Sequence, residues 1–582
     1  MILSTWYGTD EGLDDIGARP PLHTRRPAFA WEGPLASDVA VDDEVVARVA
    51  TPASDLHLAR PRQRPIPGAV TNARAISGTV SLTADVVVIG SGAGGAVAAA
   101  RFAEAQQQVI IVEEGEYLHA PDFNELERDM VPRLFADQAM RTTTDGSVSL
   151  LQGGAVGGGT TVNWMLMLRP PEHVLEEWLQ KLRLPDWSSG DLAPHVERVG
   201  EEVHAREAPF DAHSPSNLAI LDGARALGWR ARIGTINVRN CVRAGTCSLG
   251  CRYDAKMGAL LTYLPRAFAA GARLYAGASV ERIEILERDQ PSRSRTPPLK
   301  RVHAAVRDAR TGQVRARIVI EAPRVVLAAG AVGTPVILQR SGLGGGGVGR
   351  YLRLHPTTGV FGRYARETYP LAGIPQTALC DEFIRRDANG HGFWIECPSL
   401  QPALASAALP GFGTAHRDLM RQIPHCIPFI VLVRDGSGTG ASMGSVTLDR
   451  SGRVRIRYGL TAGDGDNLRH GMAAAARLHL AAGAEEAFSL HTPPVRATRE
   501  RDLSAVQQAS VAPNRVALFS AHVNGTCRLG VDPATSGCAP SGERHGTRGL
   551  IVMDGSLLPT APGVNPQWTI MAMASLLAER QR

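Results

Sequence analysis

The stretch Asp85–Glu113, DVVVIGSGAGGAVAAARFAEAQQQVIIVE, decides the fold. An apolar run leads into Gly90, Gly92 and Gly95, which follow the spacing G-x-G-x-x-G. An alanine-rich helical run comes next, and then a second apolar strand that ends in the acid Glu113. In this pattern the first glycine makes a tight turn, the second lets the backbone approach a pyrophosphate, and the third packs helix on strand. The acid accepts hydrogen bonds from ribose hydroxyls, so the stretch predicts a dinucleotide site.

The composition is that of a globular protein with more than one domain. The chain has 582 residues, more than one hydrophobic core usually supports. It is 44% hydrophobic and 20% charged, and its net charge of +5 is too small to argue for nucleic acid or membrane partners. Eight cysteines in so long a chain do not make a disulfide scaffold.

The N-terminal residues predict no targeting segment. MILSTWYGTDEGLDD has neither a basic n-region nor an apolar h-region, so we do not expect a secretory signal. No window of about 18 apolar residues is free of Gly, Pro and charge, so no transmembrane segment is expected. We therefore expect a cytoplasmic enzyme.

A second glycine-rich segment, Gln152–Asn163, reads QGGAVGGGTTVN. So many glycines disfavour a long helix or strand and favour close backbone approach to a ligand. A surface loop is the alternative. It fits less well, because the segment is nearly free of charge and runs into the apolar WMLML.

Together these motifs resemble the glucose–methanol–choline (GMC) family of FAD-dependent oxidoreductases. The first family signature matches Gly153–Asn163, and the second matches GAVGTPVILQRSGLG from Gly330. The C-terminal pattern is HVNGTCRLG, containing His522, followed by MDGSLLPTAPGVNPQWTIMA from Met553. The resemblance runs from about residue 85 to the end, and it is strongest to a bacterial branch similar to long-chain alcohol oxidases and dehydrogenases.

The resemblance implies an α/β fold with a discontinuous Rossmann-like FAD-binding domain and an α+β substrate domain. Alternating runs between residues 346 and 515 independently suggest an antiparallel sheet, together with an alanine-rich helix at Gly471–Ala482. The expected ranges are 1–80 for an N-terminal extension, 81–175, 236–345 and 516–582 for the FAD-binding domain, and 176–235 and 346–515 for the substrate domain.

The resemblance also implies the residues that hold FAD. Backbone near Val280 is expected to contact the adenine. The full set is Gly90, Gly92, Ala93, Gly95, Glu113, Gly157, Gly158, Thr160, Asn163, Val280, Asp554, Gly555, Pro566 and Thr569.

Two residues stand where the family has its catalytic pair. His522 is expected to take the hydroxyl proton of an alcohol while Asn565 positions the substrate oxygen and flavin N5 accepts the hydride. Glu396, on a predicted strand, is either a second acid or base or an ordinary half-buried carboxylate. His355, before a proline, is expected to be structural.

Three cysteines form a cluster, Cys241, Cys247 and Cys251, with C-x5-C-x3-C spacing. Some sugar dehydrogenases of the family hold a three-iron cluster on cysteines of similar spacing, so these thiolates are candidate iron–sulfur ligands. The alternatives are reduced cysteines that pack a loop, or one disulfide with a thiol left over. Zinc is disfavoured, because no His or fourth Cys lies close in sequence.

Three functions remain open at this point. The first is oxidation of a primary or secondary alcohol, with a lean towards apolar alcohols and with oxygen, a quinone or a protein carrier as electron acceptor. The second is a redox-neutral flavin-containing lyase of the same family. The third is a non-catalytic flavoprotein, whose expected mark is loss of His522 or Asn565, and both are present.

Overall fold

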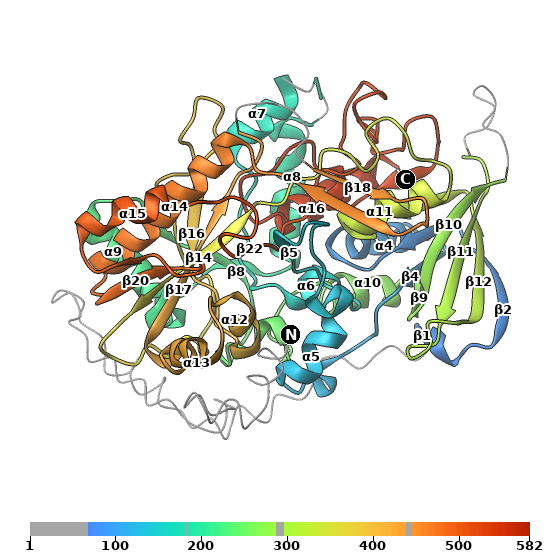
Figure 1. Ribbon diagram of the computed structural model, residues 1–582. Helices are drawn as coiled ribbons and strands as arrows, with labels where there is room; N and C mark the ends of the chain where they lie inside the picture. The colour runs from blue at the N-terminus through green and yellow to red at the C-terminus, as the bar shows by residue number, and fades with distance from the viewer. Residues whose placement is uncertain (1–67, 181–182, 185–186, 287–295, 438–443, 582) are drawn as a thin grey trace.

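A computed structural model describes residues 68–180, 183–184, 187–286, 296–437 and 444–581. Two sheet-based bodies lie side by side (Figure 1). One contains the sheet around β3 with helices α4 and α16, and the other contains the sheet around β14 with helices α9 and α14. The two largest hydrophobic clusters follow this division.

The dinucleotide unit forms as predicted. Strand β3 (Val86–Ile89) leads through the glycine turn into α4 (Ala93–Glu104), and β4 (Val109–Glu113) follows. All four residues of β3 are buried, because helices and sheets cover both its faces. β3 pairs in parallel with β4 on one side and with β13 (Arg324–Leu327) on the other.

This six-stranded parallel sheet has the order β1-β9-β4-β3-β13-β23. Its strands come from distant parts of the chain, so the cofactor domain is assembled from several segments. The remaining members are β1 (Val70–Asn72), β9 (Arg273–Ala276) and β23 (Leu550–Val552).

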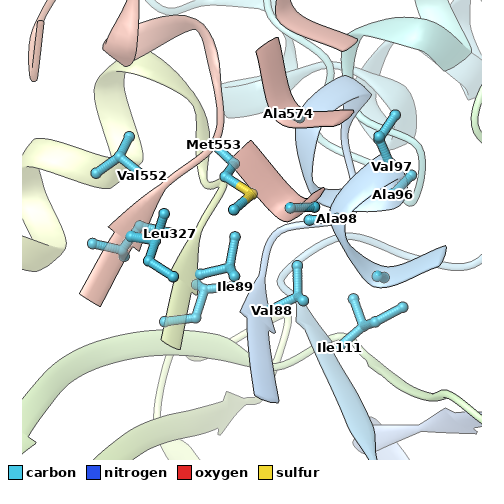
Figure 2. Packing of buried hydrophobic residues seen from close by; sticks show 14 of the residues in the cluster. Val88, Ile89, Ala96, Val97, Ala98, Ile111, Leu327, Val552, Met553 and Ala574 are labelled. Atoms are coloured by element: carbon cyan, nitrogen blue, oxygen red, sulfur yellow. The ribbon is translucent and has the colours of Figure 1, made fainter. Parts of the chain in front are cut away.

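Small side chains bring α4 close to its neighbours. α16 (Gln567–Arg580) and α10 (Tyr263–Ala269) both pack on α4, whose residues from Gly94 to Ala103 are all buried. Figure 2 shows apolar side chains of the sheet filling the space beneath these helices. The labelled residues are Val88, Ile89, Ala96, Val97, Ala98, Ile111, Leu327, Val552, Met553 and Ala574.

A second sheet stands beside the first, in the order β10-β11-β12-β2. Its strands are β10 (Ser279–Ile285), β11 (Lys300–Arg307), β12 (Val314–Ala322) and β2 (Gly78–Thr83). β2 pairs in parallel with β12, and β1 pairs in parallel with β9. Residues 70–83 thus contribute to both sheets of this body, whereas most of the expected N-terminal extension lies outside the described residues.

The other body is built on a nine-stranded sheet, in agreement with the alternating sequence pattern. Its main path is β21-β20-β14-β17-β16-β15-β7, and all pairings along this path are antiparallel. The central strands are β14 (Thr357–Arg363), β17 (Cys426–Val433), β16 (Phe393–Glu396) and β15 (Ala378–Cys380). The outer strands are β7 (Ala231–Ile233), β20 (Glu486–Ser489) and β21 (Arg496–Ala497). Off this path, β22 (Leu518–Ser520) pairs with β14, and β5 (Val148–Leu150) pairs with β22.

Two details differ from the sequence pattern. β18 (Gly444–Leu448) and β19 (Val454–Tyr458) form a separate hairpin rather than joining the large sheet. Helix α14 spans Ala462–Ala481, so it begins well before the expected Gly471. A capping box between Thr461 and Asp464 starts it early.

Two helices cover the large sheet. α14 packs on β14 and β17 and contacts α9 (Pro215–Leu227). A Cβ on Gly471 would lie 2.2 Å from Val431 Cγ1, so glycine lets α14 lie directly on β17. In the part of the chain that is described, no helix has the length and apolarity needed to cross a membrane.

Candidate flavin and substrate site

In the first glycine turn, Gly90 and Gly95 have the turn and packing roles that their spacing predicts. Gly90 has φ +97°, and a Cβ there would lie 2.3 Å from the Ala328 carbonyl oxygen. A Cβ on Gly95 would lie 2.1 Å from the Gly90 carbonyl oxygen, so Gly95 sets the contact of helix and strand. At Gly92, by contrast, the nearest atom is 3.8 Å from a Cβ. Gly92 caps α4 without a side-chain oxygen, so the N–H groups that follow, from Ala93 on, face an open approach suited to phosphate.

The second glycine turn packs backbone to backbone on the first. Gly157 N donates to Ser91 Oγ at 3.0 Å. Gly158 has φ +53°, and a Cβ there would lie 2.9 Å from Gly92 Cα. Thr160 Oγ1 donates to the Gly157 carbonyl at 2.7 Å and so closes the turn. This packing, with Gly157 and Thr160 buried, argues against the surface-loop interpretation of residues 152–163.

Glu113 is held by protein donors at the end of β4. Its carboxylate accepts from Ser91 N at 2.9 Å, Ser91 Oγ at 2.7 Å and Gly115 N at 2.9 Å. Burial raises the pKa of this carboxyl, and the neighbouring Glu114 raises it further. A carboxylate has about four acceptor sites, so one remains for a ribose hydroxyl. Sequence analysis missed Ser91, which occupies an unspecified position of the glycine motif.

Asp554 joins the second family signature to the C-terminal pattern. One carboxylate oxygen accepts from Gly330 N at 2.8 Å and Thr334 Oγ1 at 2.5 Å, and the other accepts from Ser556 N and Oγ. Burial raises the pKa of Asp554 despite these donors. Gly555, the next residue, accepts a hydrogen bond from Gly525 N at 3.0 Å.

Gly94, whose role sequence analysis did not identify, fixes the position of the Asp554 carboxylate. A Cβ on Gly94 would lie 1.8 Å from the Met553 carbonyl oxygen. Only glycine at this position lets α4 reach the chain just before Asp554.

Buried polar atoms without protein partners gather at the start of α16. Thr569 Oγ1 and Asn163 Oδ1 are buried and accept or donate no hydrogen bond within the described chain. Asn163 Nδ2 donates to Gln567 Oε1, a residue that sequence analysis missed. The cap residue Pro566 supplies no side-chain hydrogen bond to the helix. Because buried polar groups are normally paired, these atoms fit the polar edge of a flavin.

A cavity of about 470 Å³ lies next to the Glu113 turn. Gly115, Gly154, Gly277 and Ser279 line it, which places it where the adenosine end of the cofactor is expected. Val280 itself does not line the cavity. It is buried in β10, and its neighbour Ser279 takes that place. The cavity at the adenosine end and the unpartnered polar atoms at the start of α16 therefore both fit FAD.

The predicted catalytic histidine is paired with a second histidine. His522 and His355 face each other with their Nδ1 atoms 3.2 Å apart and their rings at 87°. Burial lowers the pKa of His522 well below its usual value, and the nearby His355 lowers it further. His355 is fully buried, and burial together with Arg434 lowers its pKa to about 3. Both imidazoles are therefore neutral near pH 7.

The hydrogen-bond network assigns the protons on these rings. Gly563 N donates to His355 Nε2 at 3.2 Å, so His355 carries its hydrogen on Nδ1. That hydrogen is donated to Nδ1 of His522, which leaves the hydrogen of His522 on Nε2. His355 was expected to be structural, and its contacts with Gly563 and His522 are of that kind; through them it also sets the tautomer of His522.

Asn565 is oriented by a buried carboxylate. Its Nδ2 lies 3.5 Å from Glu396 Oε2, while its Oδ1 is buried without a partner. Glu396 also accepts from Trp394 Nε1 and Gln376 Nε2, each at 2.5 Å. Burial raises the pKa of Glu396 to about 7. Glu396 is therefore fully buried rather than half-buried, and it contacts one of the predicted catalytic residues.

Edge-to-face packing of aromatic rings links the two predicted catalytic residues. The His355 ring packs edge-to-face on Trp394, with centroids 5.2 Å apart. Trp394 bonds Glu396, which in turn contacts Asn565. The structure thus brings His522 and Asn565 to one site through His355, Trp394 and Glu396.

The three clustered cysteines are not arranged as iron ligands. In the ranges that the structure describes, no group of three or more His, Cys, Asp or Glu side chains could hold a metal ion, and all three cysteines are free thiols. Cys241 Sγ accepts from Arg243 N and Cys251 Sγ from Ala255 N, both at 3.3 Å. Burial raises the pKa of the Cys241 thiol to about 11, which disfavours a thiolate. The iron–sulfur expectation is therefore not supported.

Lys256 holds the cysteine loop against the flavin turn instead. Its buried Nζ donates to the carbonyls of Thr161, Asn163 and Cys247 at 2.7, 3.0 and 2.5 Å. Burial lowers the pKa of Lys256 to about 8. This agrees with the alternative of reduced cysteines that pack a loop.

Comparison with known proteins supports the assignment of the two glycine turns to an FAD-dependent oxidoreductase. Two GMC oxidoreductase family models match residues 85–357 and 441–574. The long-chain-alcohol oxidase FAO4B of Arabidopsis thaliana is 30% identical over 85% of this chain and 67% of its own length. An uncharacterized GMC-type oxidoreductase of Mycobacterium tuberculosis is 33% identical over 85% of this chain and 75% of its own.

Solved structures share the fold. Pyridoxine 4-oxidase from Mesorbium loti has a TM-score of 0.63 at 18% identity, covering 85% of this chain and 98% of that one. A formate oxidase variant of Aspergillus oryzae has a TM-score of 0.61 at 16% identity, covering 87% and 99%.

The two glycine turns, the parallel sheet and the roofing antiparallel sheet define a two-domain FAD-dependent oxidoreductase. The chain belongs to the GMC oxidoreductase family.

Proposed function

We propose that the protein oxidises a primary or secondary alcohol to the carbonyl compound, with His522 and Asn565 at the reacting oxygen. The observation that carries the proposal is the buried, unpartnered Oδ1 of Asn565, at one site with a neutral His522. FAD, when bound, supplies the hydride acceptor. The relation to alcohol oxidases such as FAO4B supports the same reaction.

In the bound state Asn565 Oδ1 accepts the hydrogen bond of the substrate hydroxyl and so fixes the direction of its oxygen; the hydroxyl hydrogen then turns to His522 before it is transferred. Orientation of this kind contributes to rate because it removes the need to align the reactants in the transition state. Glu396 holds the amide of Asn565 by accepting from Nδ2, so the carbonyl oxygen stays turned to the substrate.

His522 interacts with the same substrate oxygen. In the resting tautomer its Nε2–H donates to the substrate oxygen, whose own hydroxyl hydrogen lies on Asn565 Oδ1. To take that proton itself, His522 must first pass its own hydrogen to the Nδ1 side. This requires His355 to carry its hydrogen on Nε2 and to give up the contact with Gly563. The proposed base step therefore includes a tautomer exchange within the histidine pair.

The surroundings favour an apolar alcohol. Val564, next to Asn565, belongs to a buried apolar cluster at this site. Its other buried members are Leu166, Leu168, Leu379, Trp394, Ile430 and Leu432. Burial of a substrate's hydrocarbon part against such a wall contributes roughly 0.8 kcal/mol per methylene group.

Anaerobic reduction of the flavin tests the proposal. The holoenzyme is mixed with alcohols of increasing chain length, and bleaching of the visible flavin bands is followed. We expect bleaching that is faster for longer chains and that is lost in His522→Ala and Asn565→Ala with flavin still bound. Oxygen, a quinone and a carrier protein are then added in turn to identify the acceptor.

The same experiment separates the alternatives. A redox-neutral lyase would convert substrate without bleaching the flavin, and a non-catalytic flavoprotein would do neither. Either result with a full series of alcohols would overturn the proposal.

A further inference from the structure

Arg434 is a buried cation at the end of β17 that the proposed chemistry does not use. Its side chain is 1% exposed, and Glu177 of α7 (Glu172–Gln180) is its ion-pair partner. The guanidinium also donates to backbone carbonyls of two loops. These are Ala561 at 3.0 Å, Asn389 at 3.3 Å and Gly390 at 3.2 Å.

One of these loops carries the substrate-binding asparagine. Arg434 Nε holds Ala561, and a Cβ on Gly563 would lie 3.0 Å from Arg434 Cδ. Gly563, at φ +71°, therefore lies directly on the arginine stem, where a larger residue would clash. The N–H of Gly563 donates to His355 Nε2, and Asn565 is two residues further on. The place of this loop thus sets both the tautomer of His355 and the position of Asn565.

The next residue, Asp435, holds the other side of the site. Its carboxylate accepts from Leu354 N at 3.0 Å and His355 N at 3.2 Å. Tyr458 OH donates to the same carboxylate at 2.8 Å. Arg434 and Asp435, the first two residues after β17, therefore hold two chain segments. Arg434 holds the loop that carries Asn565, and Asp435 holds the segment at His355.

We propose that Arg434 and Asp435 form a bracket that sets the separation between the Asn565 loop and the His355–His522 pair. This inference rests on the proposed alcohol oxidation. Both are positioning residues, since neither is placed at the substrate. The planar guanidinium can hold several acceptors in fixed directions at once, which the single ammonium of lysine cannot reproduce.

Two variants test the bracket, and a third is the control. Arg434→Lys keeps the positive charge but loses the planar guanidinium with its several donors. Asp435→Asn keeps one acceptor oxygen but removes the negative charge. Lys300→Met is the control. Lys300 is another buried cation bonded to backbone carbonyls, those of Pro298 and Pro323, in a sheet on the other body.

The first measurement is hydrogen–deuterium exchange of the holoenzyme, which needs no turnover. We expect faster uptake in residues 559–566 for Arg434→Lys, and in the segment around Leu354 for Asp435→Asn. The segment from β3 to α4 is expected to exchange as in the wild type, and Lys300→Met is expected to leave residues 559–566 unchanged.

The second measurement is the anaerobic rate of flavin reduction by an alcohol. A displacement of about 1 Å at a reacting centre costs about 10²-fold in rate. We expect a fall of that order in the limiting rate for Arg434→Lys, with a smaller change in the alcohol concentration for half-saturation because the apolar wall is intact. Lys300→Met is expected to reduce at the wild-type rate.

The outcomes are distinct. Wild-type exchange and wild-type reduction rates in both Arg434→Lys and Asp435→Asn would overturn the bracket. If no alcohol reduces the wild-type flavin, the proposed function fails, and the exchange experiment still decides whether Arg434 holds the loop. A loss of rate in the Lys300→Met control as large as in Arg434→Lys would show a general effect of destabilisation and would also overturn it.

Discussion

The Nδ1 atoms of His355 and His522 lie 3.2 Å apart, and the N–H of Gly563 occupies the other nitrogen of His355. The tautomer of His522 is thus set indirectly by the backbone N–H of Gly563, through the two successive hydrogen bonds that His355 makes. Through His355, the loop that carries Asn565 thereby determines which ring nitrogen of His522 carries the hydrogen.

Replacing His355 tests this control. His355→Leu removes the donor to Nδ1 of His522, so the ring loses its orientation and its partner for tautomer exchange. We expect flavin reduction by alcohol to slow at least about 10-fold, less than the ~10²- to 10⁴-fold of general acid–base catalysis because His522 itself remains. His303→Gln, a change on β11 in the other body, is the control and should reduce at the wild-type rate. An unchanged rate in His355→Leu would contradict the assigned network.

Stability against acid gives a second view of His355. Its pKa of about 3 in the folded protein lies below the 6.5 of an unfolded histidine, so the unfolded state binds more protons between these values. His355 therefore contributes a loss of stability as pH falls below about 6.5. We expect the free energy of unfolding of His355→Leu, measured with urea, to fall less steeply between about pH 6.5 and 4.5 than that of the wild type. Parallel curves would show that the pKa of His355 is the same in the folded and unfolded states.

Glu396 should impose a pKa near neutrality on the reaction. Its carboxylate holds the amide of Asn565 when ionised, and its pKa is raised by burial to about 7. Below that pH the carboxyl is protonated and no longer holds Nδ2; once the amide of Asn565 rotates, the carboxyl donates to Oδ1 and withdraws this acceptor from the substrate. We expect the wild-type rate of flavin reduction to fall as pH drops through about 7, and Glu396→Gln to be slower and to lack this limb. A limb near pH 7 that persists in Glu396→Gln would assign it to another group.

Much of the cofactor domain could be predicted because its signals are local. The turn at Gly90, the packing at Gly95 and the buried strand β3 each follow from neighbouring residues, and the structure reproduces them. The predicted start of helix α14 was less accurate, because the capping box at Thr461 starts the helix at Ala462 despite the glycines that follow. There a local signal was present and was outweighed by composition.

The parts of the site that were missed depend on contacts between distant segments. Arg434 and Ala561 are 127 residues apart, and Gly563 and His355 are 208 apart. In both pairs, no motif next to either residue in the sequence indicates that the two residues are in contact. The cysteine cluster shows the opposite error, because suggestive spacing along the chain did not correspond to a metal-binding arrangement in space.

A matched pair of glycine variants separates binding from folding at the flavin turn. Gly92 has open space for a Cβ and an ordinary φ of −68°, whereas a Cβ on Gly95 would meet the Gly90 carbonyl at 2.1 Å. We expect Gly92→Ala to fold with little loss of apoprotein stability but to bind FAD more weakly, because the methyl group enters the phosphate approach. Gly95→Ala should lose about 1–3 kcal/mol of folding free energy from overpacking. Flavin titration measures the FAD affinity of both variants, and urea unfolding measures the stability of both apoproteins. A larger loss of stability in Gly92→Ala than in Gly95→Ala would contradict the assigned roles.

The cysteine loop should contain no iron and should depend on Lys256. Anaerobically purified protein is expected to show flavin bands only, with no iron or sulfide by chemical analysis. Lys256→Met leaves three buried carbonyls without their donor, so a loss of at least about 2 kcal/mol and weaker flavin retention are expected. Cys241→Ser should keep its flavin. About three irons per chain, lost in Cys241→Ser, would restore the iron–sulfur interpretation.

Glu127 links helices α5 (Glu127–Leu134) and α12 (Pro402–Ala408) by a contact that depends on pH. It lies in α5, and its buried carboxylate accepts from Ala403 N at 2.7 Å and Leu404 N at 3.0 Å at the start of α12. Burial raises its pKa to about 7, above the unfolded value of 4.5, so the folded state binds more protons between these values.

The contribution of Glu127 is therefore fully present below about pH 4.5 and is lost as pH rises through 7. From the size of the shift this loss is roughly 3 kcal/mol in the free energy of unfolding. Glu127→Gln stays neutral throughout, so the difference in stability between wild type and variant should move in favour of the variant by an amount of that order between about pH 5 and 8. Urea unfolding at both pH values measures the difference directly, and Glu197→Gln, at an exposed ion pair, is the control. A difference that does not change with pH would mean that Glu127 is ionised in the fold, held by the N–H groups of α12 as a charged cap.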